Sequence, residues 1–229
     1  LCHPRAKDLL THWQQRGVKI VLDMSHAHGV PVDGYALYPF ADAAVWSFYA
    51  TKVLTSGEGG IVWFKNKADS DAAKVIANAG KQRGAGVFGL SPSRNLRLSE
   101  IAAAMMYVEI ANSPVLYKER RDVAQVYDDT GLPGMHKQIP GLRTTFYKYA
   151  VPVHQTRYGK HSADQVEAAL RSKGVFCTGR VHGIETNGSR NWSQPRSQFW
   201  ARNHVCLPIG RGVTLADAEY VVRMWNQVT

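Results

Sequence analysis

Two short, mainly apolar runs, residues 43–47 and 60–64, flank a loop that carries one lysine, Lys52, and a glycine-rich stretch, residues 56–60. Apolar runs of this length that are bounded by turn signals are typical of buried strands. The glycines allow the chain to turn tightly before the second run begins. The pattern therefore predicts a strand, a short loop that presents Lys52, and a second strand.

A third, largely apolar run, residues 18–22, ends at a carboxylate, Asp23. Open α/β sheets bind their ligands at the edge where the strands end. A lysine and a carboxylate at that edge suit pyridoxal phosphate. The lysine amine can form a Schiff base with the cofactor aldehyde, and the carboxylate can keep the pyridine nitrogen protonated. Ser47, five residues before Lys52, is placed to donate a hydrogen bond to a phosphate.

Helical segments alternate with these strands in the first half of the chain. We expect helices over residues 5–16 and 69–79, and a long helical tract over residues 98–128. Pro114 should break or sharply kink this tract, because proline removes a backbone hydrogen bond and clashes with the preceding turn. Short buried strands that alternate with helices predict an α/β layered domain.

The pattern changes after the glycine- and proline-rich stretch at residues 131–134, and the second half reads as a smaller α+β domain. We place the domains at residues 1–115 and 116–229. The expected strands and helices of the second domain cover residues 147–153, 162–173, 174–178, 205–208 and 214–228. Thr214 and Asp217 supply an N-cap and an acidic first turn for the last of these helices.

Composition excludes several classes of function. No apolar run approaches the roughly 20 residues that a membrane-spanning helix needs. The net charge of +10 comes from 28 basic residues that are spread along the chain, so we expect no nucleic-acid binding. A solvated basic surface or attraction of an acidic small substrate, such as a sugar diphosphate, explains the charge. The scattered cysteines, Cys2, Cys177 and Cys206, argue against a disulfide framework and fit a reducing cytoplasm.

Two further motifs do not indicate the sites that they superficially suggest. His26 and His28 form a His-x-His pair, but no third ligand is near in sequence, so we predict no metal site. Stacking or hydrogen bonding of His26 to a ring is the favoured interpretation. A Gly-x-Gly-x-x-Gly match at residues 84–89 follows a helix rather than a strand, so it lacks the scaffold of a dinucleotide site.

Several segments, taken in order, resemble the DegT/StrS family of sugar aminotransferases. They are residues 23–29, 47–52, 57–60, the block Asn-Leu-Arg-Leu-Ser-Glu-Ile-Ala-Ala at 95–103, and the Leu-Pro pair at 207–208. The resemblance covers essentially the whole chain. It implies a fold-type I enzyme that uses pyridoxal phosphate, with a partial large α/β domain followed by a smaller α+β domain. It also implies a homodimer with active sites between the subunits.

The resemblance implies a role for each matching residue. Lys52 would be the internal-aldimine lysine, Asp23 the partner of the pyridine nitrogen, and Ser47 a phosphate ligand. Asn95 would reach the phosphate in the neighbouring subunit's site. His26 falls where the family mostly carries a glutamine, near the ring hydroxyl of the cofactor.

Arg180 and His182 correspond loosely to the family's substrate-facing segment, and a solvated loop is the alternative interpretation. The implied reaction is transamination of a nucleotide-linked keto-sugar or of a keto-cyclitol, with glutamate or glutamine as amino donor. The lysine at position 52 favours amino transfer over the family's deoxygenating branch, which carries a histidine there.

The family's N-terminal portion has no counterpart in these residues, so we expect an incomplete site. That portion supplies strands of the large sheet and a helix N-terminus that binds the cofactor phosphate. The alternative function is a non-catalytic or regulatory member, or a fragment that only binds a partner.

Overall fold

The computed structural model describes most of the chain, namely residues 3, 5–30, 36–81, 93–138, 140–142, 144–153, 162–181 and 195–228. The chain divides into two compact units, Leu1–Pro114 and Val115–Thr229, and each has a sheet of its own. In the described part of the chain, no helix is both long enough and apolar enough to cross a membrane.

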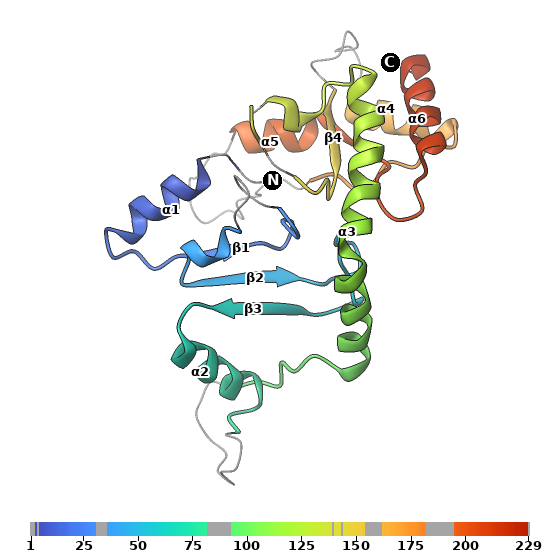
Figure 1. Ribbon diagram of the computed structural model, residues 1–229. Coiled ribbons are helices and arrows are strands. Elements are labelled where there is room, and N and C mark those ends of the chain that lie inside the picture. Colours follow the sequence, from blue (N-terminus) through green and yellow to red (C-terminus); the bar gives the residue numbers. More distant parts are fainter. Residues whose placement is uncertain are drawn as a thin grey trace. The chain divides into compact units, whose positions relative to one another are not determined.

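The first unit is built on a three-stranded sheet in the order β1-β2-β3 (Figure 1). β1 (Val21–Asp23) pairs in parallel with β2 (Ala43–Ser47), and β2 pairs antiparallel with β3 (Gly60–Phe64). Asp23 and Ser47 are the last residues of the two parallel strands, so both stand at the same edge of the sheet. The strands predicted over residues 43–47 and 60–64 are therefore confirmed.

The prediction that these strands are buried is wrong for the outer two. Val21 of β1 is 67% exposed, and Ile61 and Val62 of β3 are 52% and 49% exposed. Within the described residues only β2 has a neighbouring strand on each side, and its first residues, Ala43 and Ala44, are buried. β1 is also shorter than expected and begins at Val21 rather than at residue 18.

Three short helices accompany this sheet. α1 (Ala6–Gln14) and α2 (Lys67–Ala77) lie close to their predicted ranges, and a 3-10 turn, η1 (Tyr38–Phe40), precedes β2. The side chain of Asn66 accepts a hydrogen bond from the backbone of Ala68 and caps α2.

α3 (Glu100–Asp129) runs through Pro114 without interruption, so the predicted break is wrong. Proline deprives a helix of one backbone hydrogen bond. α3 nevertheless remains one helix of 30 residues. Its later part contributes Val123, Ala124 and Tyr127 to the core of the second unit.

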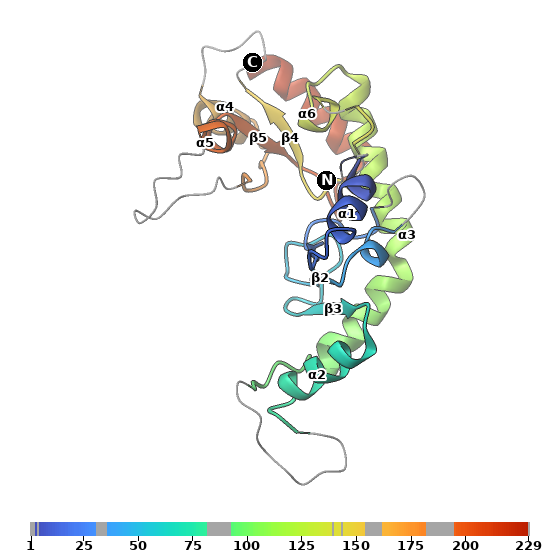
Figure 2. The same cartoon turned by 90° about the vertical axis from the view of Figure 1, so that its left-hand side faces the viewer.

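The second unit contains a two-stranded antiparallel sheet made of β4 (Tyr149–Pro152) and β5 (His204–Leu207). α4 (Ala163–Ser172) contacts both β5 and α6 (Leu215–Val228) (Figure 2). The core between these elements is apolar and includes Val151, Leu170, Val205, Val221 and Trp225. Two further helices complete the unit, the 3-10 turn η2 (Met135–Gln138) and α5 (Pro195–Arg202).

Local capping explains where two of these helices begin. Ser162 and Gln165 form a capping box at the start of α4. Thr214 and Asp217 exchange hydrogen bonds at the start of α6, as the sequence predicts. The strand expected over residues 174–178 does not form. An isolated bridge between Thr178 and Cys206 pairs this segment with β5, and α5 was not predicted.

Candidate active site

The loop that carries Lys52 is closed at its base by the buried residue Phe48, which follows β2 directly. The Phe48 amide donates to the Gly59 carbonyl at 2.8 Å, and the Phe48 carbonyl accepts from the Ser56 amide at 3.1 Å and the Thr55 hydroxyl at 3.0 Å. Both ends of the loop are therefore fixed to one residue, and Lys52 is held between them.

The glycine run after this loop is required by space and by backbone conformation. Gly57 and Gly59 have φ angles of 82° and 128°, which L-residues rarely adopt. A Cβ on Gly60 would lie 2.7 Å from the Trp46 carbonyl oxygen, and a Cβ on Gly59 would lie 2.5 Å from Leu98 Cδ1. This packing explains why the lysine loop ends in consecutive glycines.

The structure brings Lys52, His26 and Asp23 to one edge of the sheet. Lys52 Nζ lies 2.6 Å from His26 Nε2, and an ammonium group can only donate, so His26 accepts through Nε2 when Lys52 is charged. Hydrogen bonding from Ser25 lowers the pKa of Asp23, and the electrostatic influence of His26 and Lys52 acts in the same direction. Asp23 is therefore ionised at neutral pH.

This edge is open within the described residues. Asp23 and His26 are exposed, and Lys52 is half-buried. Ser47 is also half-buried, and its Oγ accepts from the Tyr49 amide at 3.3 Å. The group is thus an accessible surface edge with a cation, an anion and a hydroxyl.

Asn95 lies elsewhere in the first unit. It forms an isolated β-bridge with Asn78, which follows α2, and its side chain is exposed. The Asn78 side chain in turn accepts a hydrogen bond from Arg97 at 2.7 Å. The structure therefore groups Asp23, His26 and Lys52, and it places Asn95 beside Asn78.

Arg180, a candidate substrate ligand, belongs to the second unit and is held by carboxylates of α4. Its Nε and Nη2 donate to the two oxygens of Glu167, each at 2.9 Å, and Nη2 also donates to Asp164. These bonds raise the pKa of the guanidinium above its ordinary value. His182, the other candidate, lies outside the described residues, as do Cys2 and the glycines at 84–89.

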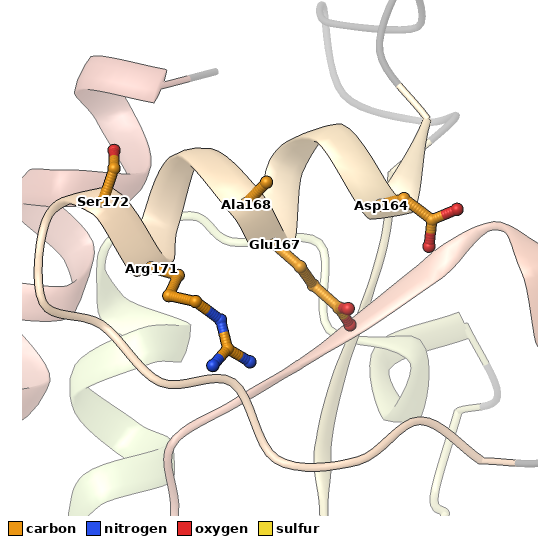
Figure 3. Close-up of a pocket in the computed structure, with 5 residues that line it drawn as sticks. All are labelled: Asp164, Glu167, Ala168, Arg171 and Ser172. Atoms are coloured by element: carbon orange, nitrogen blue, oxygen red, sulfur yellow. The ribbon is translucent and has the colours of Figure 1, made fainter.

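A shallow depression of about 440 Å³ lies along α4 (Figure 3). Glu167 and Arg171 extend from the helix toward the same side. The lining residues are Asp164, Glu167, Ala168, Arg171 and Ser172. The depression is open to solvent, and no pattern in the sequence predicts it.

Sequence reasoning considered His28 only as a metal ligand, and the structure gives it a different environment. His28 is 3% exposed, and its Nε2 lies 2.9 Å from the Ser47 carbonyl oxygen. Burial lowers the pKa of His28 to about 4, and the electrostatic influence of Lys52 and His26 acts in the same direction. Among the described residues, no three His, Cys, Asp or Glu side chains are arranged to hold a metal ion.

The two described cysteines are poorly suited to chemistry. Cys206 is buried and Cys177 is half-buried, and neither forms a disulfide. Burial raises the pKa of Cys177 to about 12 and that of Cys206 to about 11. Both side chains are therefore neutral, weakly nucleophilic thiols at physiological pH.

The residues at the sheet edge fit pyridoxal phosphate. Lys52 would supply an amine for the aldehyde, and Asp23 would supply an ionised carboxylate for the pyridine nitrogen. The hydroxyl of Ser47, at the end of β2, is available to the phosphate. These groups come from the ends of two adjacent strands and from the loop after the second strand.

Comparison with known proteins shows the family to which the chain belongs. Residues 7–225 match the model of the DegT/DnrJ/EryC1/StrS aminotransferase family. The chain is 29% identical over 138 residues to GDP-perosamine synthase of Vibrio cholerae, covering 59% of this chain and 37% of that protein. It is 33% identical over 148 residues to dTDP-3-amino-3,4,6-trideoxy-alpha-D-glucose transaminase of Micromonospora megalomicea subsp. nigra, covering 60% of this chain and 38% of that protein.

The fold is similar to that of the aminotransferase TlmJ from Streptoalloteichus hindustanus, with a TM-score of 0.82 and 25% sequence identity. That match covers 96% of this chain and 62% of TlmJ, so the chain spans less than two thirds of each of these relatives. Aminotransferases of this family use pyridoxal phosphate, and structural neighbours are known in PLP and PMP forms. The chain belongs to the DegT/DnrJ/EryC1/StrS aminotransferase family and has the partial α/β architecture of a fold-type I enzyme.

Proposed function

We propose that the protein transfers an amino group to a keto-sugar and that Lys52 carries the chemistry. The observation that supports this proposal most directly is the placement of the Lys52 amine 2.6 Å from His26, at the sheet edge that also carries the ionised Asp23. The names of both curated relatives refer to nucleotide-linked amino sugars. A nucleotide-linked keto-sugar is therefore the favoured acceptor over a keto-cyclitol, and glutamate or glutamine is the proposed donor.

Bound pyridoxal phosphate supplies an electron sink for the bond broken at the donor's α-carbon. With the cofactor in place, the Lys52 amine would act as general base and take the α-proton of the amino donor. His26 accepts a hydrogen bond from Lys52 Nζ and thereby orients the amine. Asp23 would hold the proton on the pyridine nitrogen, and the Ser47 hydroxyl would donate to the phosphate.

The remaining assignments concern assembly. The family resemblance assigns Asn95 to a phosphate across a homodimer interface, and its exposed side chain is accessible for this role. Residues 1–115 would form the cofactor-binding part and residues 116–229 the small domain. Arg180 would reach a substrate phosphate only by exchanging its bonds to Glu167 and Asp164. We place the protein in the cytoplasm, where its free thiols stay reduced.

The decisive experiment traps the cofactor on the protein. Purified protein is mixed with pyridoxal phosphate, reduced with borohydride and digested, and the modified peptide is identified by mass spectrometry. Modification at Lys52, with loss of amino transfer to nucleotide keto-sugars in Lys52→Ala and Lys52→Arg, supports the proposal. Protein that takes up no cofactor would instead support a non-catalytic member that binds a partner, and a Lys52→Ala protein with full turnover would exclude the assignment of Lys52.

A further inference from the structure

β2 extends one hydrogen-bonding position beyond its last backbone hydrogen bond to β1. The last backbone bond joins the Met24 amide to the Val45 carbonyl at 2.8 Å. Alternate residues of a strand direct their carbonyls to the same side, so the Ser47 carbonyl also faces β1. A longer β1 would satisfy this carbonyl with a backbone amide, but β1 ends at Asp23.

The side chain of His28 provides the missing donor. Its Nε2 lies 2.9 Å from the Ser47 carbonyl oxygen. A carbonyl can only accept, so Nε2 carries the hydrogen and Nδ1 is left as an acceptor. Among the described residues, Nδ1 has no hydrogen-bond partner. The ring is 3% exposed and lies 6.1 Å, centroid to centroid, from the ring of Phe48, which closes the lysine loop.

We propose that His28 is a positioning residue that joins the Asp23–Gly29 segment to the base of the Lys52 loop through the Ser47 carbonyl. By replacing a backbone amide, the imidazole allows the chain to leave the sheet at Asp23 and turn back. This turn presents Asp23 and His26 beside Lys52. The effect of His28 on amino transfer rests on the proposed function. Its role in joining the two segments rests on the geometry alone.

The electrostatic surroundings favour this arrangement. Lys52 and His26 both lower the pKa of His28, as does burial. A neutral imidazole can donate through Nε2 without placing a second positive charge under Lys52. His28 therefore acts as a fixed dipole rather than as an acid or a base.

The test compares His28→Gln with His28→Leu in the purified protein. The glutamine amide nitrogen is as many bonds from Cα as Nε2 of histidine, so it can donate to the Ser47 carbonyl, whereas leucine fills the space without a donor. We expect His28→Leu to lower kcat by roughly tenfold to a hundredfold, with KM for the keto-sugar within about threefold. The circular dichroism of the bound cofactor should change in His28→Leu, and His28→Gln should restore both readouts.

His204 offers a matched control in the second unit. It is 2% exposed, its Nδ1 lies 2.6 Å from the Trp200 carbonyl oxygen, and its Nε2 accepts from the Val181 amide. His204→Leu should reduce stability and leave the circular dichroism of the cofactor unchanged. If His28→Leu behaved in the same way, or if His28→Gln lost as much as His28→Leu, the positioning role would be wrong.

A second readout needs no cofactor and separates this inference from the proposed function. Amide hydrogen exchange of Phe48 and Lys52, whose amides bond to Gly59 and Tyr49, should become faster in cofactor-free His28→Leu but not in His28→Gln. If exchange becomes faster in His28→Leu but borohydride never traps pyridoxal phosphate on Lys52, the proposed function is rejected and the positioning role is retained. Unchanged exchange in His28→Leu would reject the positioning role whether or not Lys52 is labelled.

Discussion

Lys52 Nζ and His26 Nε2 lie 2.6 Å apart although the two residues are separated by 26 positions in the sequence. The contact joins the segment after β1 to the loop after β2. It therefore links the carboxylate of Asp23 and the amine of Lys52 into one group at the sheet edge.

Replacement of His26 should slow amino transfer without preventing attachment of the cofactor. His26→Leu removes the acceptor that orients Lys52 Nζ, and we expect roughly tenfold slower single-turnover transfer, whereas His26→Gln, which retains an acceptor, should stay within about threefold. His12, an exposed histidine of α1 that interacts with Arg16, provides the control, and His12→Leu should leave the rate unchanged. An unaltered rate in His26→Leu would remove His26 from the site.

Substitution at Gly60 should disturb the pairing of β2 and β3. An alanine Cβ would lie 2.7 Å from the Trp46 carbonyl oxygen, and backbone on both sides limits relief of this contact. We expect Gly60→Ala to lower the free energy of unfolding by about 2 kcal/mol, measured by urea denaturation. Gly179→Ala is the matched control, because the nearest atom to its Cβ would be Lys148 Nζ at 4.0 Å. Equal stability of the two variants would contradict the packing at Gly60.

Acid should destabilise the protein in part through His28. Its pKa is about 4 in the folded state and 6.5 ordinarily, so between these values the unfolded chain binds more protons and stability falls as the pH is lowered. From about pH 7 to about pH 5 this single group should reduce the free energy of unfolding by about 2 kcal/mol. Urea denaturation at both pH values measures the loss, and His28→Gln should lose correspondingly less. The same loss in both proteins would show that other groups cause it.

Loss of the Tyr149 hydroxyl should weaken the core of the second unit. This hydroxyl donates to Asp128 at 2.6 Å, and His136 and Lys137 also lie within 3.2 Å of the same carboxylate. Tyr149→Phe removes a hydrogen bond to a charged acceptor, which typically contributes about 2 kcal/mol. Tyr220, whose exposed hydroxyl donates to the Lys173 carbonyl, is the matched control, and Tyr220→Phe should cost clearly less in thermal denaturation.

Sequence reasoning identified the elements whose cause is local. The glycine run predicts the turn after the lysine loop because Gly57 and Gly59 need φ angles that other residues rarely adopt. Ser162 and Thr214 mark helix starts because each caps a backbone amide only three residues ahead. Such features depend on a few neighbouring residues, so the sequence contains all the information that they require.

Features that depend on distant partners could not be predicted in this way. The apolar runs at β1 and β3 indicate strands, but their burial depends on which layers cover them. His28 became a candidate only when its contact with Ser47 was visible, 19 positions away. Pro114 indicates a break by its chemistry, yet the 30-residue α3 continues through it.

The register of the sheet has a consequence for the order of folding. The antiparallel pair β2–β3 joins neighbouring segments, and its closing contacts, such as the Phe48 amide with Gly59, span few residues. The parallel pair must close a longer connection before Met24 reaches Val45, which carries a larger entropic cost. In pulsed hydrogen exchange during refolding, we expect the Phe48 amide to become protected before the Met24 amide. The hairpin that carries Lys52 would then form first, and β1 with Asp23 would pair with it afterwards.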